Sequence, residues 1–139
     1  MSEDQISVPP APGKVAKQVI TTPDTSPFIT GRRDFFKYRD LGTMEATNGG
    51  MHATVTKGTI GIVPTGWHYH ELQVQFLYFL KGWVKLEFED GTTHIFKEGD
   101  SCYIPNGVKH NELEGSDDFE VLEVLMPGEI KTISCDQPA

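Results

Sequence analysis

The chain has 139 residues, of which 20 are acidic and 12 basic, and its formal net charge is −8. This length suits one domain built around one hydrophobic core. The negative balance, with Arg32-Arg33 as the only basic pair, argues against binding to nucleic acid or to an anionic membrane. Apolar runs are too short to span a bilayer and no signal peptide is visible, so we expect a cytoplasmic protein.

The first 31 residues differ from the rest in composition. They carry few large apolar side chains and five of the nine prolines, namely Pro9, Pro10, Pro12, Pro23 and Pro27. Such a stretch cannot bury enough apolar surface to fold alone. We therefore predict an extended or disordered N-terminal arm over residues 1–31, lying across the domain or a partner subunit, and a single folded domain over residues 32–139.

From residue 51 onward, runs rich in β-branched and aromatic residues alternate with turn residues. Strands are predicted at residues 52–56, 59–63, 67–70, 74–80, 83–89, 93–96, 101–104 and 119–126. Asp90-Gly91 is typical of a tight hairpin turn. Because no segment shows a sustained helical period, the pattern indicates an all-β sandwich or barrel.

Two of the predicted strands, 74–80 and 119–126, carry apolar residues on both faces. A barrel exposes its outer face to water, so a second apolar face needs a cover. The N-terminal arm or a second subunit would supply it, and we expect a homodimer.

The segment Trp67-His68-Tyr69-His70 carries the first sign of chemistry. Side chains alternate along a strand, so His68 and His70 point to the same face and form a clamp for a metal ion. Imidazole suits Fe, Mn, Ni, Zn and Cu alike, so the pair identifies no particular metal. Two histidines at this spacing are a weak signal on their own.

A second segment, Gly99 to His110, strengthens the first, and together they resemble the cupin superfamily. Residues 66–82 resemble its first motif and residues 99–114 its second. The matching positions are His68, His70, Gln75 (where the family has Glu) and Gly82, then Gly99, Pro105, Gly107 and His110. The resemblance implies a double-stranded β-helix, or jelly-roll, barrel. It also implies a divalent metal ion held by His68, His70, Gln75 and His110.

Two departures from the family pattern bear on the chemistry. Gln75 replaces the usual Glu ligand, and Glu114 replaces the final Asn of the second motif. Three imidazoles and a neutral amide leave the full charge of +2 on the metal, which strengthens it as a Lewis acid toward an anionic or carbonyl ligand. Two alternatives stay open: Gln75 as a hydrogen-bonding pocket residue that does not touch metal, and His110 as a hydrogen-bonded core histidine.

The remaining reactive side chains are expected to be structural or solvated. We expect ordinary strand positions for His52 and His94, and a side chain pointing away from His70 for Glu71. Cys102 is predicted to be a buried thiol rather than a nucleophile, because no basic neighbour would lower its pKa. Glu112 and Glu114 are expected to be solvated.

The resulting hypothesis is a small metalloenzyme that acts on a carboxylate- or enol-bearing small molecule as a dioxygenase, isomerase or lyase. One alternative is a non-catalytic module that binds or senses a small molecule through the same metal. The other is a metal-free structural or dimerisation protein, which would need hydrogen-bond partners for each buried imidazole.

Overall fold

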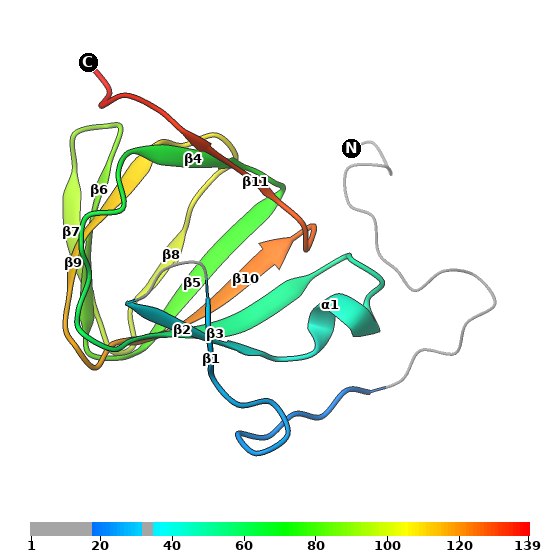
Figure 1. Cartoon of the computed structure of the whole chain (residues 1–139). Helices are drawn as coiled ribbons and strands as arrows, with labels where there is room; N and C mark the ends of the chain where they lie inside the picture. Colours follow the sequence, from blue (N-terminus) through cyan, green and yellow to red (C-terminus); the bar gives the residue numbers. More distant parts are fainter. Residues whose placement is uncertain (1–17, 32–34) are drawn as a thin grey trace.

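The computed structural model describes residues 18–31 and 35–139, which fold into two antiparallel sheets. One sheet has the order β1 (Ile29–Thr30), β2 (Phe36–Asp40), β3 (His52–Gly58), β10 (Glu120–Met126), β5 (Val74–Lys81) and β8 (Ser101–Tyr103). The other has the order β11 (Lys131–Ser134), β4 (His68–Glu71), β9 (His110–Gly115), β6 (Trp83–Phe88) and β7 (Thr93–Lys97). The sheets face each other across a common interior (Figure 1), so the predicted all-β jelly-roll fold is confirmed.

Strand β5 shows how the sequence pattern places side chains inside the barrel. Gln75, Leu77 and Phe79 are buried, whereas Tyr78 and Leu80 are exposed. This is the alternation expected of a strand with one face toward the core. Strand β10 lies beside β5 with Leu77 opposite Glu123, which fixes the inward face of both strands.

Aromatic rings dominate the core between the sheets. Phe79 stacks on Phe96 with ring centroids 4.9 Å apart, and Phe119 meets Phe36 edge-on at 5.7 Å. Phe79 and Phe119 are each only 2% exposed. Because these rings come from both sheets, they hold the sheets together at one end of the interior.

The predicted strand at residues 59–63 is wrong. The chain leaves the sheet after Gly58 and runs as irregular structure through this segment, with Ile60 74% and Val63 58% exposed. Gly61 has φ +90°, and a β-carbon there would lie 3.0 Å from the carbonyl oxygen of Gly115. A left-handed backbone at this position cannot continue a strand.

Five elements were not predicted. They are β1, β2, β9, β11 and the single helical turn α1 (Thr43–Ala46). Strands β9 and β11 are largely polar, with the sequences HNELEG and KTIS, and so carry little β signal of their own. Their pairing partners in the sheet determine their conformation.

The described end of the predicted N-terminal arm joins the domain. Strand β1 pairs with β2, and the Arg39 guanidinium donates a hydrogen bond to the Ser26 carbonyl oxygen at 2.8 Å. Residues 1–17 lie outside the described part of the chain. The boundary between residues 31 and 32 therefore stays a prediction.

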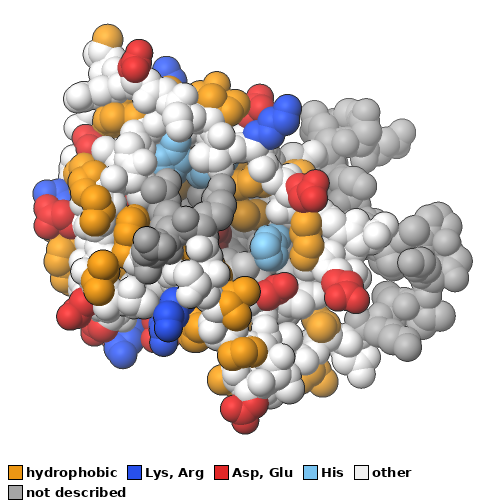
Figure 2. Space-filling view, in the orientation of Figure 1, with side chains coloured by type: hydrophobic (Ala, Val, Ile, Leu, Met, Phe, Trp, Pro, Cys, Tyr) orange, Lys and Arg blue, Asp and Glu red, His pale blue; other side chains and the backbone are white. Residues whose placement is uncertain are grey.

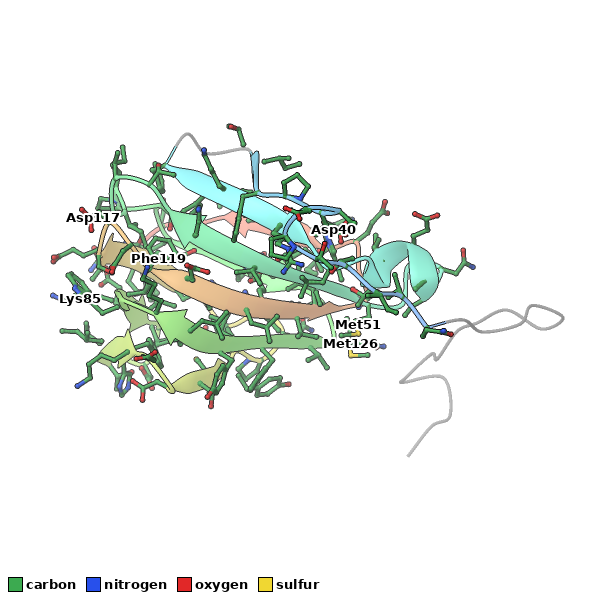
Figure 3. All side chains as sticks on the ribbon, turned by 90° about the horizontal axis from the view of Figure 1, so that it is seen from below. Asp40, Met51, Lys85, Asp117, Phe119 and Met126 are labelled. Carbon is green, nitrogen blue, oxygen red and sulfur yellow. The ribbon has the colours of Figure 1, made fainter. Side chains whose placement is uncertain are left out.

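The outer face of the larger sheet keeps the apolar side chains that the sequence pattern led us to expect. Tyr78, Leu80 and Tyr103 of β5 and β8 are 40%, 37% and 55% exposed. Figure 3 looks onto this face, with β3, β10 and β5 lying side by side. Within the described residues, no helix is long and apolar enough to cross a membrane.

The smaller sheet has few backbone contacts between β4 and β9, and we call this junction the seam. In the described part of the chain, β4 joins β9 through a single residue pair, His68 opposite His110. The neighbouring pairs are more extensive, with β11 running along four residues of β4. The seam thus places two histidines opposite each other on neighbouring strands at the wall of the interior.

Candidate metal centre

A cavity of about 540 Å³ lies between the two sheets. Its volume falls in the range usual for small-molecule sites. Four histidines and many of the apolar side chains of the core line it together. Histidine side chains are visible among hydrophobic and acidic ones on the face of the molecule shown in Figure 2.

The structure brings together the three histidines that the motifs singled out. His68 and His70 come from β4 and His110 from β9, and one nitrogen of each lies within 4.8 Å of the others. The ring centroids are 4.5 Å apart for His68 and His110, and 5.1 Å and 5.2 Å for the pairs that include His70. Imidazoles that converge at this distance can share one metal ion.

Hydrogen bonds hold the histidine rings by their outer nitrogens. Nδ1 of His68 lies 2.7 Å from the Gly66 carbonyl oxygen, and Nδ1 of His110 lies 3.0 Å from that of Val108. A carbonyl oxygen only accepts, so each Nδ1 donates, and in the neutral ring Nε2 keeps its lone pair. This is the arrangement usual for metal-bound histidine.

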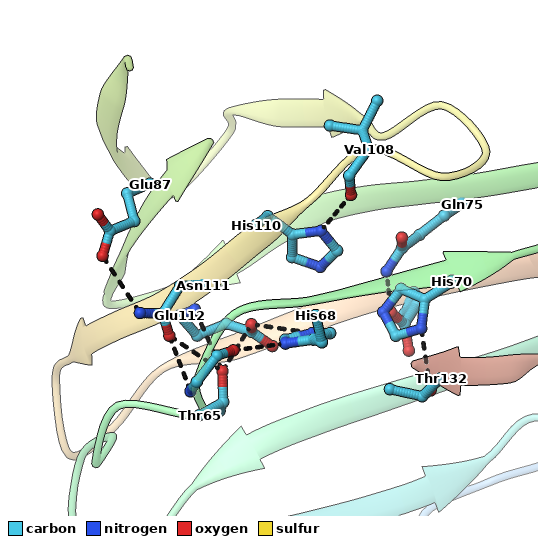
Figure 4. Close-up of polar contacts among 12 residues, drawn as sticks. Thr65, His68, His70, Gln75, Glu87, Val108, His110, Asn111, Glu112 and Thr132 are labelled. Carbon is cyan, nitrogen blue, oxygen red and sulfur yellow. Dashed lines mark hydrogen bonds and ion pairs between the residues drawn. The ribbon is translucent and has the colours of Figure 1, made fainter. Parts of the chain in front are cut away.

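His70 is held in a similar way. Its Nδ1 lies 3.0 Å from the Thr132 hydroxyl on β11, and dashed lines in Figure 4 mark this contact and the one between His110 and Val108. Strand β11 therefore contributes to the site by orienting a ring on β4, although its sequence gave no sign of this role.

Gln75 fits a metal site because one end of its amide is anchored and the other is not. The side chain is 4% exposed, and its Nε2 donates a hydrogen bond to Glu123 Oε2 at 3.1 Å. Its carbonyl oxygen Oε1 is buried with no hydrogen-bond partner among the described residues. A buried acceptor without a hydrogen bond lowers the stability of the folded protein, and coordination to a metal ion would give this oxygen a partner.

Burial favours the neutral form of one histidine of the triad, His110. The pKa of His110 is lowered below its ordinary value, first by its burial, while the charge of Glu112 and the hydrogen bond to the Val108 carbonyl oppose the shift. The nearby His68 lowers the pKa further. A neutral imidazole is the form that binds metal, so this environment favours the ligating state.

Sequence reasoning missed two carboxylates that line the cavity, Glu112 and Glu123. Glu112 was expected to be solvated, but its Oε2 lies 3.4 Å from His68 Nε2 and accepts a hydrogen bond from the Thr65 hydroxyl at 2.9 Å. The signal was present, since residue 112 is two positions after His110 and a regular strand puts both on one face.

Glu114 behaves as expected. Its side chain is 60% exposed and lies 3.7 Å from Lys85. A register shift beside Lys85, between β6 and β9, separates Glu114 from the inward face that carries Glu112.

The other candidates divide between the cavity and the surface. His52 lines the cavity, and its Nε2 lies 3.9 Å from Asp40 Oδ1. His94 and Glu71 are exposed. Burial raises the pKa of the Cys102 thiol, which argues against a nucleophile there.

The chain matches one protein family and resembles several solved structures. A family model described as "Cupin domain" matches residues 51–125. No curated protein matches the chain. The polyketide cyclase RemF from Streptomyces resistomycificus superposes with a TM-score of 0.71 at 20% identity, covering 88% of this chain and 90% of that chain.

Two further solved structures extend this comparison. KdgF from Halomonas sp. gives a TM-score of 0.65 at 18% identity, over 80% of this chain and 94% of that chain. A predicted oxalate decarboxylase from Thermotoga maritima gives a TM-score of 0.56 at 26% identity, over 66% of this chain and 80% of that chain.

Proposed function

The chain belongs to the cupin domain family, as the match over more than half of its length shows, and from this premise we propose that it is a metal-dependent enzyme. In this proposal His68, His70, His110 and Gln75 hold a divalent ion that receives an oxygen of a carbonyl- or enol-bearing small molecule. One observation carries the proposal: the imidazoles converge, and the Gln75 carbonyl oxygen is buried without a partner among the described residues.

The donor set suits a first-row transition metal. Imidazole nitrogens and a neutral amide oxygen accept Fe, Mn, Ni, Zn or Cu. When bound, such an ion polarises a carbonyl oxygen or stabilises the negative charge of an enolate. The side chains named here supply the orientation: backbone carbonyls fix two of the rings, Thr132 fixes the third, and Glu123 fixes the amide.

The cavity wall supports a substrate with an apolar skeleton. Phe36, Phe79 and Phe119 line it together with Leu77, Val84, Leu86, Ile104 and Val121. Among the described lining residues there are two carboxylates and neither Lys nor Arg. Such a lining disfavours a polyanion and favours a largely neutral molecule whose enolisable oxygen reaches the histidine triad.

A reaction without net oxidation fits this site best, such as an isomerisation, a lyase step or a ring closure. A neutral ligand set stabilises a ferric ion less than a set that includes a carboxylate, which weighs against a dioxygenase. Two similar structures are a polyketide cyclase and a predicted oxalate decarboxylase, and these names support an enzyme rather than a structural protein.

Elemental analysis of protein purified without added metal or chelator tests the proposal. We expect close to one Zn or Ni per subunit, and metal-dependent exchange of the α C–H protons of a cyclic monoketone in D₂O, faster than in buffer alone and followed by NMR. Fe or Mn with oxygen uptake would instead favour a dioxygenase. Binding of the ketone without faster exchange would favour the non-catalytic module, and failure to bind any metal on reconstitution would rule out the enzyme.

We also propose that two copies associate through the exposed apolar face of β5 and β8. Tyr78, Leu80 and Tyr103 supply its exposed apolar surface. Light scattering after size exclusion should give twice the chain mass, and Tyr78→Glu should shift the protein toward the monomer. A wild-type monomer at high micromolar concentration would contradict the dimer. A cytoplasmic location stays a prediction from the sequence.

A further inference from the structure

We propose that the hydroxyls of Thr54 and Thr56, on the inward face of β3, bind oxygen atoms on the skeleton of the substrate. This inference rests on the proposed function and adds a substrate class to it, namely a ketone with at least one further hydroxyl or carbonyl group. The primary observation is that both threonines line the cavity and are each only 8% exposed. Neither hydroxyl forms a hydrogen bond with another described residue.

The two threonines face the cavity because of the pleat of β3. Alternate residues of a strand point to the same side, and His52, Thr54 and Thr56 are the residues of β3 that line the cavity. Ala53 and Val55, which alternate with them, are also buried but do not line it. Positions two apart on a strand are separated by about 7 Å, so the threonines can contact two different oxygens of one molecule.

The strand register relates the threonines to the proposed metal ligand Gln75. Leu125 of β10 lies opposite His52 on one side and opposite Gln75 on the other, so these three residues share one row of the inner face. Thr54 belongs to the next inward row, opposite Glu123. Strands β3, β10 and β5 lie side by side (Figure 3), and neighbouring strands are about 4.8 Å apart, so β3 is about 10 Å from β5. A molecule with one oxygen at the metal can therefore present a second oxygen to the threonines across β10.

The polar side chains next to Thr54 in the sheet already have other partners. Glu123, opposite Thr54 on β10, accepts a hydrogen bond from the Gln75 amide at 3.1 Å. Asp40, opposite Thr54 on β2, accepts one from the Gly42 backbone N–H at 2.8 Å. The threonine hydroxyls thus keep their capacity to donate one hydrogen bond and to accept others, and they can use it for a ligand in the cavity.

The chemistry of a hydroxyl limits the groups that can bind there. A hydroxyl donates to a carbonyl oxygen and both donates to and accepts from another hydroxyl, without requiring a charge on the ligand. The carboxylates of Glu112 and Glu123 also line the cavity and disfavour an anionic group. The threonine pair therefore favours a neutral skeleton that carries several oxygens over a plain hydrocarbon ketone or an acid.

Deletion of the hydroxyls tests the inference. Thr54→Val and Thr56→Val, singly and together, keep nearly the same side-chain shape. The Kd values of 1-tetralone and of its 5-, 6- and 7-hydroxy derivatives are measured by ligand-observed NMR on the Zn²⁺-loaded chain. We expect at least one hydroxy derivative to bind wild type about threefold to tenfold more tightly than 1-tetralone, and this preference to fall below about twofold in the double variant. Thr93→Val, exposed on β7 and outside the cavity, is the matched control and should keep the preference.

The stability of the metal-free variants gives a readout that does not depend on ligand or metal. Because neither hydroxyl is bonded to a described residue, the double variant should be at least as stable as wild type in urea denaturation. A lower urea midpoint would show that the hydroxyls are bonded within the protein, and would overturn the inference.

The remaining outcomes separate this inference from the proposed function. A Zn²⁺-loaded wild type that binds no hydroxy derivative more tightly than 1-tetralone would overturn the inference and leave the metal site standing. The same holds if the double variant keeps the full preference. A wild-type protein that takes up no metal would overturn the proposed function together with the inference.

Discussion

Replacing Gln75 with glutamate tests the contact between the Gln75 amide nitrogen and the Glu123 carboxylate. Gln75 is 4% exposed, and its Nε2 lies 3.1 Å from Glu123 Oε2. The variant puts two carboxylates at about this separation, where two unit charges repel by roughly 5 kcal/mol at an effective dielectric constant of about 20. A proton shared by the pair limits this cost. We therefore expect the metal-free variant to lose about 2–4 kcal/mol of unfolding free energy at pH 8.

Urea denaturation of chelator-treated protein at pH 8 and pH 5 measures this loss. Repulsion raises the pKa of the carboxyl pair in the folded variant, so the folded state binds more protons than the unfolded state. The loss should consequently shrink as the pH falls. The double variant Gln75→Glu/Glu123→Gln is the matched control, because it restores one amide and one carboxylate and should recover most of the stability.

The metal-bound form should respond in the opposite direction. A carboxylate at position 75 adds a negative charge to the proposed ligand set, so we expect tighter binding of Zn²⁺ and weaker binding of anionic ligands. Two results together would refute the reasoning: metal-free Gln75→Glu as stable as wild type at pH 8, and no change in metal affinity. They would place the Gln75 amide in contact with neither Glu123 nor the metal.

Three other predictions concern the triad and the core. His110→Ala should remove most bound metal on elemental analysis, whereas the exposed His94→Ala should keep it; equal metal in both would contradict the site. Burial lowers the pKa of His110 from its ordinary value of 6.5. Near and below pH 6.5 the folded metal-free protein therefore binds fewer protons than the unfolded chain, and its free energy of unfolding should fall as the pH drops. His110→Gln should flatten that slope in urea denaturation between pH 8 and pH 5.5, and an unchanged slope would assign it to other groups. Phe79→Ala should cost about 3–5 kcal/mol in the same assay, since its 2% exposed ring stacks on Phe96, and a loss below about 1 kcal/mol would show that the core collapses around the gap.

Features that depend on local chemistry could be predicted from the sequence. The alternation of β5 depends only on the pleat of a strand, so the predicted strand at residues 74–80 already places Gln75, Leu77 and Phe79 on one face, which the structure buries. The spacing of His68 and His70 likewise places both rings on one face. The second motif then located His110, and the structure brings all three imidazoles together.

Features that depend on pairing between distant segments could not be predicted. The segment 59–63 has strong β composition, yet the left-handed Gly61 and the lack of a strand partner among the described residues leave it irregular. Strand β9 has a polar sequence and forms because β6 pairs with it, and that pairing brings Glu112 to His68. The Gln75 carbonyl oxygen has no hydrogen-bond partner within the described part of the chain, and the orientation of its amide depends on Glu123, which lies 48 residues further along the chain.

A metal ion bound across the seam between β4 and β9 would also hold these two strands together. The proposed ligands come from β4 and β9 on either side of that seam and from β5 in the opposite sheet. A bound ion would act as a cross-link at the place where the backbone ladder is thinnest, adding about 4 kcal/mol against opening at a free metal concentration of 1,000 times its Kd. The protein would then use one ion both to receive a substrate and to keep its barrel closed, so that loss of metal loosens the wall of the cavity itself.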